Sequence, residues 1–335
     1  MHAFSRKLVA WQRRHGRHGL PWQGTRDPYR IWLAEVMLQQ TQVEAATPYY
    51  LRFLERFPDL AALAAAPVGE VLRLWSGLGY YARARNLHAA ARVVAGDLGG
   101  CFPDTAEGLQ NLPGVGRSTA AAVAAFAFGR RAAVLDGNVK RVLARHFGVE
   151  GKDEQWALAE SLLPWRGIEA YTQGLMDLGA TLCRRSNPGC GRCPVAASCV
   201  ALRQNRVAEL PAPNRRKPVP TRTATWLVLL HQGRVLLQRR PPSGLWGGLW
   251  AFPEPVGAAA GYCRRQLGCS IASPRKLDVV THGFTHFTLV AQPLRCVVKK
   301  ALPRAEMGGR MWLDLEQAPH AAVPAPVRAL LQRLG

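Results

Sequence analysis

The spacing of apolar residues divides the chain into two parts of different character. Up to about residue 206, apolar residues recur at helical spacing, which predicts a mostly α-helical domain. From residue 222 onwards, short apolar or alternating segments predict strands mixed with helices. The segment 207–221 has four prolines, several basic residues and no apolar period, so we predict a semi-rigid linker. We therefore expect a helical domain at 1–206 and an α+β domain at 222–335.

The same pattern predicts individual elements. In the first part we expect helices at 3–15, 28–42, 44–56, 59–66, 68–75, 82–97, 104–112, 117–128, 138–147, 153–163 and 167–182. In the second part we expect strands at 225–230, 234–239, 276–282, 285–291 and 295–299, and helices at 257–267 and 323–333.

A glycine-rich turn joins two of the predicted helices at Pro113, Gly114, Val115 and Gly116. Its glycines permit positive φ and leave backbone N–H groups bare, so the N-terminus of the following helix can hold a phosphate group. An ordinary turn between core helices is the alternative. An apolar pair after the second helix leads to a carboxylate, Asp136. A phosphate-binding turn followed by a carboxylate at a fixed position favours the phosphate-binding interpretation.

Glu35 lies on an apolar face of the helix predicted at 28–42, together with Ile31, Leu38 and Gln42. It is either a partly exposed glutamate at the edge of this face or a buried carboxylic acid. In the second case desolvation would raise its pKa and keep it protonated at pH 7, as a general acid requires.

The charge of the chain indicates a polyanionic partner. Lys and Arg number 44 against 22 Asp and Glu, a formal net charge of +22, and they are spread through the whole chain. We expect nucleic acid as the partner, although a basic proteome also yields arginine-rich proteins. No apolar run reaches membrane-spanning length, and the basic N-terminus lacks a signal core. We expect a cytoplasmic, nucleoid-associated protein.

Four of the eight cysteines form a cluster with the spacing C-x6-C-x2-C-x5-C: Cys183, Cys190, Cys193 and Cys199. In a reducing cytosol this pattern indicates a metal site instead of disulfides. Zinc and an iron–sulfur cluster both accept four cysteines. The other four, Cys101, Cys263, Cys269 and Cys296, are scattered along the sequence, and we expect them to be inert.

These motifs resemble the MutY-type adenine DNA glycosylases of the helix-hairpin-helix–Gly/Pro–Asp superfamily. The resemblance covers nearly the whole chain and rests on Trp22, the runs 32–42, 77–81, 112–118 and 135–141, and the four cysteines. It implies an enzyme that hydrolyses the N-glycosidic bond of adenine mispaired with 8-oxoguanine or guanine in double-stranded DNA. It also implies a [4Fe-4S] cluster at 183–199.

The resemblance implies roles for individual residues as well. Glu35 would protonate adenine at N7 and Asp136 would stabilise the sugar cation, supported by Asn138 and Ser118. An adenine pocket is implied at Trp22, Leu38 and Gln173. Further contacts to DNA are implied for Gln39, Gln40, Tyr80 and the hairpin residues. Some members have a lysine at position 118 that forms a Schiff base. A serine hydroxyl cannot form an imine, so a monofunctional glycosylase is implied.

The second domain resembles Nudix hydrolases around the segment 239–250. The glutamates that would hold Mg²⁺ are missing from 262–268, so a recognition module is implied and a pyrophosphatase is excluded. His282-Gly283-Phe284-Thr285-His286 matches the family loop that probes 8-oxoguanine, with threonine in place of serine. The resemblance therefore implies 8-oxoguanine recognition by Phe284, Thr285 and His286.

Two other functions remain open. An endonuclease III-like enzyme acting on oxidised pyrimidines has no support at Ser118. A non-enzymatic iron–sulfur DNA-binding regulator has no use for both Glu35 and Asp136. We expect a monomer that binds DNA and no membrane.

Overall fold

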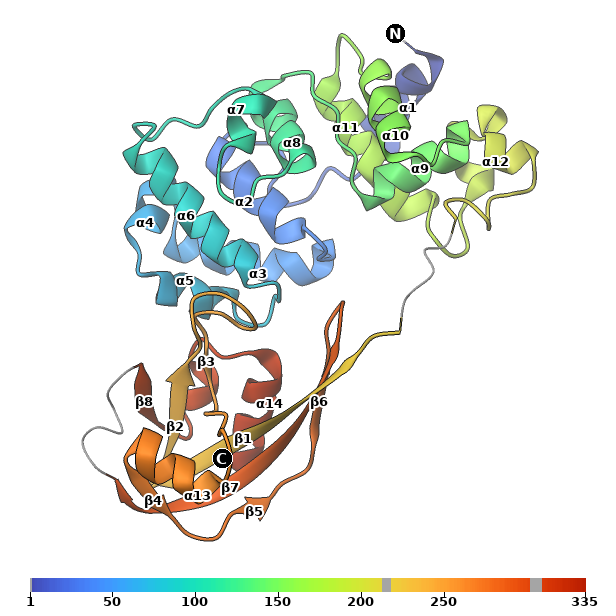
Figure 1. Ribbon diagram of the computed structural model, residues 1–335. Coiled ribbons are helices and arrows are strands. Elements are labelled where there is room, and N and C mark those ends of the chain that lie inside the picture. Colours follow the sequence, from blue (N-terminus) through green and yellow to red (C-terminus); the bar gives the residue numbers. More distant parts are fainter. Residues whose placement is uncertain (1, 213–217, 302–308) are drawn as a thin grey trace. The chain divides into compact units, whose positions relative to one another are not determined.

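A computed structural model describes residues 2–212, 218–301 and 309–335 (Figure 1). The chain folds into two compact units. Unit 1 comprises Met1–Ala65 and Asn86–Arg215, and unit 2 comprises Ala66–Arg85 and Arg216–Gly335. The linker predicted at 207–221 lies partly outside the described residues. Grouping 66–85 with the C-terminal residues was not anticipated from the sequence.

Unit 1 is helical, as predicted. Its helices are α1 (Ala3–His15), α2 (Pro28–Leu38), α3 (Val43–Arg56), α4 (Leu60–Ala65), most of α6 (Ala82–Gly96), α7 (Ala106–Gln110), α8 (Arg117–Phe128), α9 (Gly137–Phe147), α10 (Lys152–Ser161), α11 (Ile168–Asp177) and α12 (Val200–Arg203). Three packed pairs position the site: α1 with α11, α2 with α8, and α11 with α9 (Figure 1). Apolar side chains of α1, α8, α9 and α11 share one core, which includes Leu8, Val142 and Leu175.

Two helices of unit 1 end earlier than predicted. The helix expected at 28–42 ends at Leu38, because Gln40 has φ 55°, a left-handed conformation that an α-helix cannot include. Gln42 therefore precedes α3 and does not share the face of Glu35. The helix expected at 167–182 is α-helical only to Asp177 and continues as a π-helix over Leu178–Leu182. Such π-turns often occur at functional sites.

Unit 2 contains a mixed sheet with the order β3-β2-β1-β7-β4, in which β5 and β6 also pair with β7, and β8 pairs with β2. The strands are β1 (Thr221–His231), β2 (Arg234–Arg239), β3 (Trp250–Ala251), β4 (Cys269–Ile271), β5 (Arg275–Lys276), β6 (Val280–Gly283), β7 (Thr288–Ala301) and β8 (Arg310–Asp314). The segments predicted as two strands, 285–291 and 295–299, join into the single strand β7 from residue 288 onwards, because residues 288–297 pair without interruption in parallel with β1.

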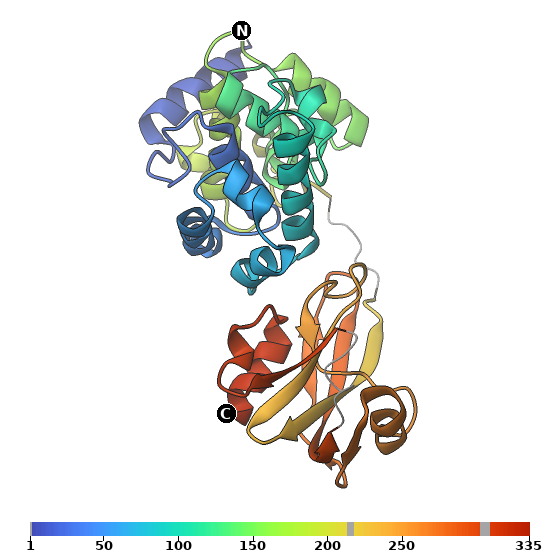
Figure 2. The same ribbon diagram turned by 90° about the vertical axis from the view of Figure 1, so that its left-hand side faces the viewer.

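Short helices cover both faces of this sheet. Figure 2 shows α13 (Ala259–Tyr262) and α14 (Ala325–Leu334) on opposite faces. A π-turn at Cys263–Leu267 continues α13 and packs on the sheet. Cys263, Cys269 and Cys296 are buried together in this core, although they are scattered in the sequence. Strands far apart in sequence bring them together.

The segment 66–85 is tied to the C-terminal residues of unit 2 by side-chain hydrogen bonds. It contains α5 (Val68–Trp75). After α5, the buried Ser76 donates through Oγ to the carbonyl oxygen of Val323 at 2.6 Å. Arg328 donates to the same hydroxyl at 2.6 Å, and Arg85 donates to the carbonyl oxygen of Gly247 at 2.8 Å. Hydrogen bonds from charged donors to buried acceptors stabilise such a junction.

No helix among the described residues is both long enough and apolar enough to cross a membrane.

Candidate active site

One cavity of about 1060 Å³ in unit 1 collects most of the residues singled out in the sequence. This volume is at the upper end of the usual range for ligand-binding cavities. The predicted residues that line it are Trp22, Glu35, Leu38, Gln39, Gln40, Gly114, Gly116, Ser118, Asp136, Asn138 and Gln173. Pro113 and Val115 belong to the same hairpin but do not line the cavity. The structure therefore places the two candidate carboxylates and the predicted adenine pocket in one space.

Glu35 projects into this cavity from α2. Its side chain is half-buried, while its neighbours Trp32, Ala34 and Val36 are almost fully buried. Desolvation, with a smaller contribution from the negative charge of Asp136, raises the pKa of Glu35 to about 8. The carboxyl group is thus mostly protonated at pH 7, which agrees with the buried-acid interpretation of the sequence.

Asp136 is held at the N-terminus of α9. Its Oδ1 accepts a hydrogen bond from the backbone N–H of Val139 at 2.7 Å, as an N-cap residue does. Before it, the buried pair Val134 and Leu135 anchors the chain in the core. Ser118 Oγ, in the first turn of α8, accepts from the backbone N–H of Leu135 at 3.1 Å. Ser118 therefore positions the segment that carries Asp136.

Arg141 fixes Asn138 and connects it to the cysteine segment. Its Nη2 donates to Asn138 Oδ1 at 2.8 Å and to the carbonyl oxygen of Gly179 at 2.7 Å. Its Nε donates to the carbonyl oxygen of Cys183 at 2.7 Å. A Cβ on Gly179 would lie 2.6 Å from Asn138 Cβ, so only glycine allows this approach. The sequence showed Arg141 inside a matched run but gave no sign of this role.

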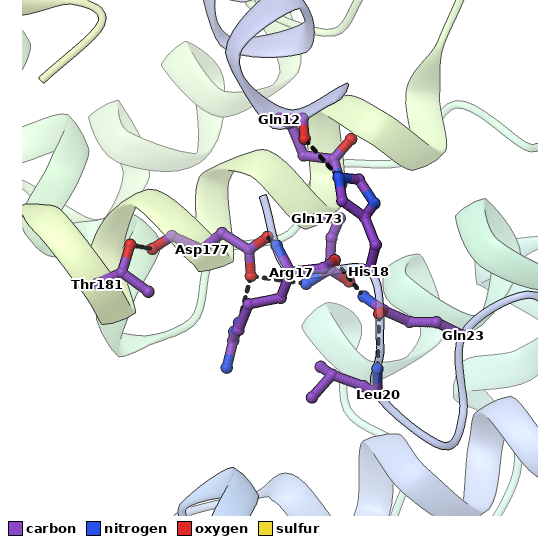
Figure 3. Close-up of polar contacts among 8 residues, drawn as sticks. All are labelled: Gln12, Arg17, His18, Leu20, Gln23, Gln173, Asp177 and Thr181. Atoms are coloured by element: carbon purple, nitrogen blue, oxygen red, sulfur yellow. Dashed lines mark hydrogen bonds and ion pairs between the residues drawn. The ribbon is translucent and has the colours of Figure 1, made fainter. Parts of the chain in front are cut away.

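A buried carboxylate, Asp177, organises the predicted adenine pocket (Figure 3). Asp177 is 1% exposed, and its Oδ1 accepts from Gln173 Nε2 at 2.8 Å. Arg17 donates to Asp177 through its backbone N–H at 2.9 Å and through Nε at 2.6 Å. Gln23 bonds the same loop through the carbonyl oxygen of Arg17 and the N–H of Leu20. The amide of Gln173 is thereby oriented with its nitrogen toward Asp177.

Arg17 and Asp177 were missed at the sequence level. Arg17 follows a glycine after α1. Asp177 is the last residue of α11, and nothing in the local sequence distinguishes it from an ordinary helical aspartate. Neither belongs to a recognisable motif, because their contact joins positions 160 residues apart.

The hairpin before α8 presents bare backbone donors at the rim of the cavity. Gly114 has φ 75°, and a Cβ there would lie 2.5 Å from Asn86 Cβ, so this position requires glycine. Gly116 caps α8 without a side-chain hydrogen bond, and Arg117 follows in the first turn. A helix N-terminus with bare N–H groups is a favourable place for a phosphate.

Basic side chains surround the same cavity: Arg17, Arg117, Lys140, Arg141, Lys152 and Arg185. Gln39 is held at the cavity wall, where its Nε2 donates to Thr119 Oγ1 at 3.0 Å. Gln40 is exposed beside it in the left-handed conformation. A concave basic surface of this kind attracts a polyanion.

The four clustered cysteines line one cavity together with Arg145. Arg145 is 3% exposed, and it donates to the carbonyl oxygens of Leu210 at 2.7 Å and Arg184 at 2.6 Å and to Cys183 Sγ at 3.5 Å. No carboxylate among the described residues pairs with this buried cation. A buried charge requires a counter-charge, so the donor set fits a metal group held by thiolates. In the part of the chain that the structure describes, no three His, Cys, Asp or Glu side chains form a site for a single metal ion.

The predicted 8-oxoguanine loop lies at the end of β6 in unit 2. Phe284 stacks on Phe287 with ring centroids 4.4 Å apart, and Thr285 and His286 are exposed. Thr285 Oγ1 lies 3.3 Å from the hydroxyl of Tyr80, which belongs to the same unit and is 48% exposed. The structure thus brings Tyr80 to the loop, whereas the sequence had placed it with the helical domain.

Known proteins resemble both parts of the chain. Residues 33–166 match the model of the HhH-GPD superfamily of base excision DNA repair proteins, and residues 225–333 match the NUDIX domain model. The chain is 32% identical to an adenine DNA glycosylase of Buchnera aphidicola subsp. Baizongia pistaciae over 339 residues, 99% of this chain and 96% of that protein. It is 33% identical to the Homo sapiens adenine DNA glycosylase over 98% of this chain and 73% of that protein.

Solved structures show the same helical fold. A thermostable thymine-DNA glycosylase aligns with a TM-score of 0.56 and 32% identity, over 60% of this chain and 95% of that chain. A non-covalent endonuclease III–DNA complex aligns with a TM-score of 0.53 and 22% identity, over 60% of this chain and 94% of that chain. These comparisons confirm the fold class and the family resemblance predicted from the sequence.

The charge of Asp136 should be measurable at Glu35. We expect Asp136→Asn to lower the pKa of Glu35 below about 8 and to leave it above the usual value, because desolvation is the larger cause. Asparagine caps a helix as well as aspartate does, so α9 should be retained. The measurement is a ¹³C NMR titration of carboxyl-labelled glutamate, with the exposed Asp153→Asn as control. An unchanged pKa in Asp136→Asn would contradict the coupling.

Proposed function

Because the chain belongs to the adenine DNA glycosylase family of base excision repair enzymes, we propose that its substrate is adenine opposite 8-oxoguanine or guanine in double-stranded DNA. The family establishes DNA as the partner and hydrolysis of the N-glycosyl bond of adenine as the reaction. The observation that carries the catalytic proposal is a carboxyl group with a pKa of about 8 in one cavity with a second carboxylate.

Glu35 acts as the general acid and Asp136 as the electrostatic stabiliser. Protonated Glu35 donates its proton to N7 of adenine, and the C1′–N9 bond breaks with its electron pair on the base. The carboxylate of Asp136 faces the positive charge that develops at C1′. Water then adds to C1′ and returns a proton to Glu35, which restores the acid. Two carboxyl groups divide the work in the same way in glycoside hydrolysis.

Neighbouring side chains hold these groups and the base. Ser118 and Arg141 position Asp136 and Asn138 through the hydrogen bonds described above. Trp22 and Leu38 supply apolar walls for a flipped adenine. The amide nitrogen of Gln173 donates a hydrogen bond to Asp177, so its amide oxygen can accept one from the exocyclic amine of adenine.

The enzyme is monofunctional in this proposal. A strand-nicking lyase of the superfamily needs a lysine amine at position 118 to form an imine. Ser118 has no amine, and its hydroxyl oxygen already accepts from Leu135. Water therefore completes the reaction and leaves an intact strand with an abasic site.

Cys183, Cys190, Cys193 and Cys199 would hold a [4Fe-4S] cluster, with Arg145 balancing the thiolate charge. The cluster would supply a rigid brace for the basic segment that contains Arg184 and Arg185. The chemistry of excision does not pass through it.

Unit 2 provides the contacts to the base opposite adenine. Thr285 and His286 offer a hydroxyl and an imidazole on an exposed loop, and Tyr80 adds a second hydroxyl beside Thr285. 8-Oxoguanine differs from guanine at O8 and at the N7 proton, so a few polar contacts at one place can distinguish them. No acidic residue occurs in α13 or the π-turn after it, which supports recognition and not pyrophosphate hydrolysis. We place the enzyme as a monomer on DNA in the cytoplasm.

The two carboxylates should be essential. Glu35→Gln removes the proton donor and Asp136→Asn removes the charge, so both should lose nearly all single-turnover cleavage while binding of the A:8-oxoguanine duplex persists. Cleavage is measured as strand scission after alkali, and untreated samples should stay intact because the enzyme is monofunctional. The exposed Glu44→Gln serves as control. A near-normal rate in either variant would refute its assigned role, and scission without alkali would refute the monofunctional assignment.

The cysteine site should contain iron. Protein purified anaerobically is expected to hold about four irons per chain, measured by elemental analysis. Cys190→Ser should lose iron, whereas Cys101→Ser, at an exposed cysteine outside the cluster, should keep it. Stoichiometric zinc without iron would overturn the assignment of the cluster.

Preference for 8-oxoguanine should depend on the loop of unit 2. Thr285→Ala combined with His286→Ala removes one or two hydrogen bonds, worth about 1–3 kcal/mol. The ratio of A:8-oxoguanine to A:G cleavage should therefore fall about ten- to a hundredfold, with single-turnover kinetics as the measurement. Thr281→Ala, at an exposed position of the strand that precedes the loop, is the control. Point variants are preferable to removal of the C-terminal residues, since 66–85 packs with them. An unchanged ratio would place recognition elsewhere.

A further inference from the structure

A second cavity of about 610 Å³ reaches the same acid from another side of unit 1. It lies among α1, the loop that precedes α2, α8 and α11, and its lining includes Gln12, Phe126 and Ala170. Three side chains line both cavities: Trp22, Glu35 and Gln173. Only these groups are common to the two spaces, so the floor of the proposed adenine pocket is also a wall of the second cavity.

The second cavity is not part of the proposed DNA-facing surface. Gly114 and Gly116 of the hairpin line the first cavity, as do the basic residues Lys140 and Arg185, and none of these lines the second. DNA anchored at the hairpin with a flipped nucleotide in the first cavity therefore covers the first opening. The second opening stays accessible to solvent.

The lining of the second cavity suits a free purine. The rings of Trp22 and Phe126 and the side chain of Ile31 offer apolar and aromatic surface. The amides of Gln23 and Gln173 and the imidazole of His18 lie nearby; Figure 3 labels these three around the loop 17–23. Apolar surface with a few polar groups is the usual composition of a small-molecule site, and the volume is in the usual range.

Hydrogen bonds fix one part of the lining, whereas an exposed ion pair holds another part weakly. Asp177 holds the loop through Arg17, and the loop is bonded again through Gln23. At the rim, Arg26 Nη2 lies 2.9 Å from Glu169 Oε1, and these side chains are 71% and 38% exposed. Exposed ion pairs contribute little stability, so this contact between two lining residues breaks easily.

We propose that the second cavity is the exit route for free adenine, which leaves past Trp22 and Gln173 while the abasic DNA is still bound. This inference rests on the proposed excision of adenine and assigns the path of its smaller product. After the C1′–N9 bond breaks, the base has the sugar and the DNA on one side. The second cavity, with its walls of aromatic and amide groups, lies on the other.

The test follows the two products separately in the full-length enzyme. A duplex with a radiolabelled target adenine and a fluorescent end label is cleaved in a single turnover. Cleavage is read as alkali-labile strand, free adenine as label that passes an ultrafilter, and bound DNA as fluorescence anisotropy. Label should appear at the rate of cleavage while the anisotropy still reports bound DNA. Label that appears only as DNA dissociates would overturn the inference. Absence of cleavage would instead refute the proposed function.

Variants at the rim test the route itself. Arg26→Trp adds bulk at the opening and should slow release of label several-fold without changing cleavage. Arg26→Ala removes the same ion pair without adding bulk, so its release should match the wild type. Ala170→Phe fills the cavity from α11 and should behave as Arg26→Trp does. Wild-type release rates in both bulky variants would overturn the route.

Discussion

The proposed chemistry depends on one constraint, a carboxylic acid that stays protonated at neutral pH. The surroundings of Glu35 raise its pKa because they exclude water and because the negative charge of Asp136 lies in the same cavity. The same arrangement keeps the two groups different: one lies on a helix among buried apolar neighbours, and the other caps a helix N-terminus. The proposed roles of the two carboxyl groups, as acid and as stabilising anion, therefore follow from their surroundings and not from residue type.

Helix α9 connects the site to the cysteine segment. It begins at the cap residue Asp136, carries Asn138 in its first turn, and presents Arg141 and Arg145 on successive turns. Arg141 bonds both Asn138 and the carbonyl oxygen of Cys183, and Arg145 bonds Cys183 Sγ. Two side chains of α9 therefore connect the cysteine segment to the end of the helix that carries the candidate residues Asp136 and Asn138.

Much of the candidate site could be predicted because its residues lie within short motifs. The hairpin glycines, Ser118 and Asp136 are close in sequence, and turn and cap rules govern them locally. Prediction failed where a local pattern was ambiguous. The polar run after Leu38 is compatible with a helix, yet Gln40 turns left-handed there. The contact of Tyr80 with Thr285 was not predicted, because the two residues lie 205 positions apart in the sequence.

The sequence by itself determined the helical and α+β parts, the hairpin, the helix caps, the four-cysteine spacing and the positions of the two candidate carboxylates. Those features depend on neighbours a few residues apart, where backbone geometry and side-chain chemistry act directly. Only the tertiary structure decided the contact of Arg17 with Asp177, the gathering of three cysteines in the core of unit 2, and the second cavity behind Glu35. These require distant segments to pack together, because burial and desolvation are properties of the folded chain and not of any short stretch of it.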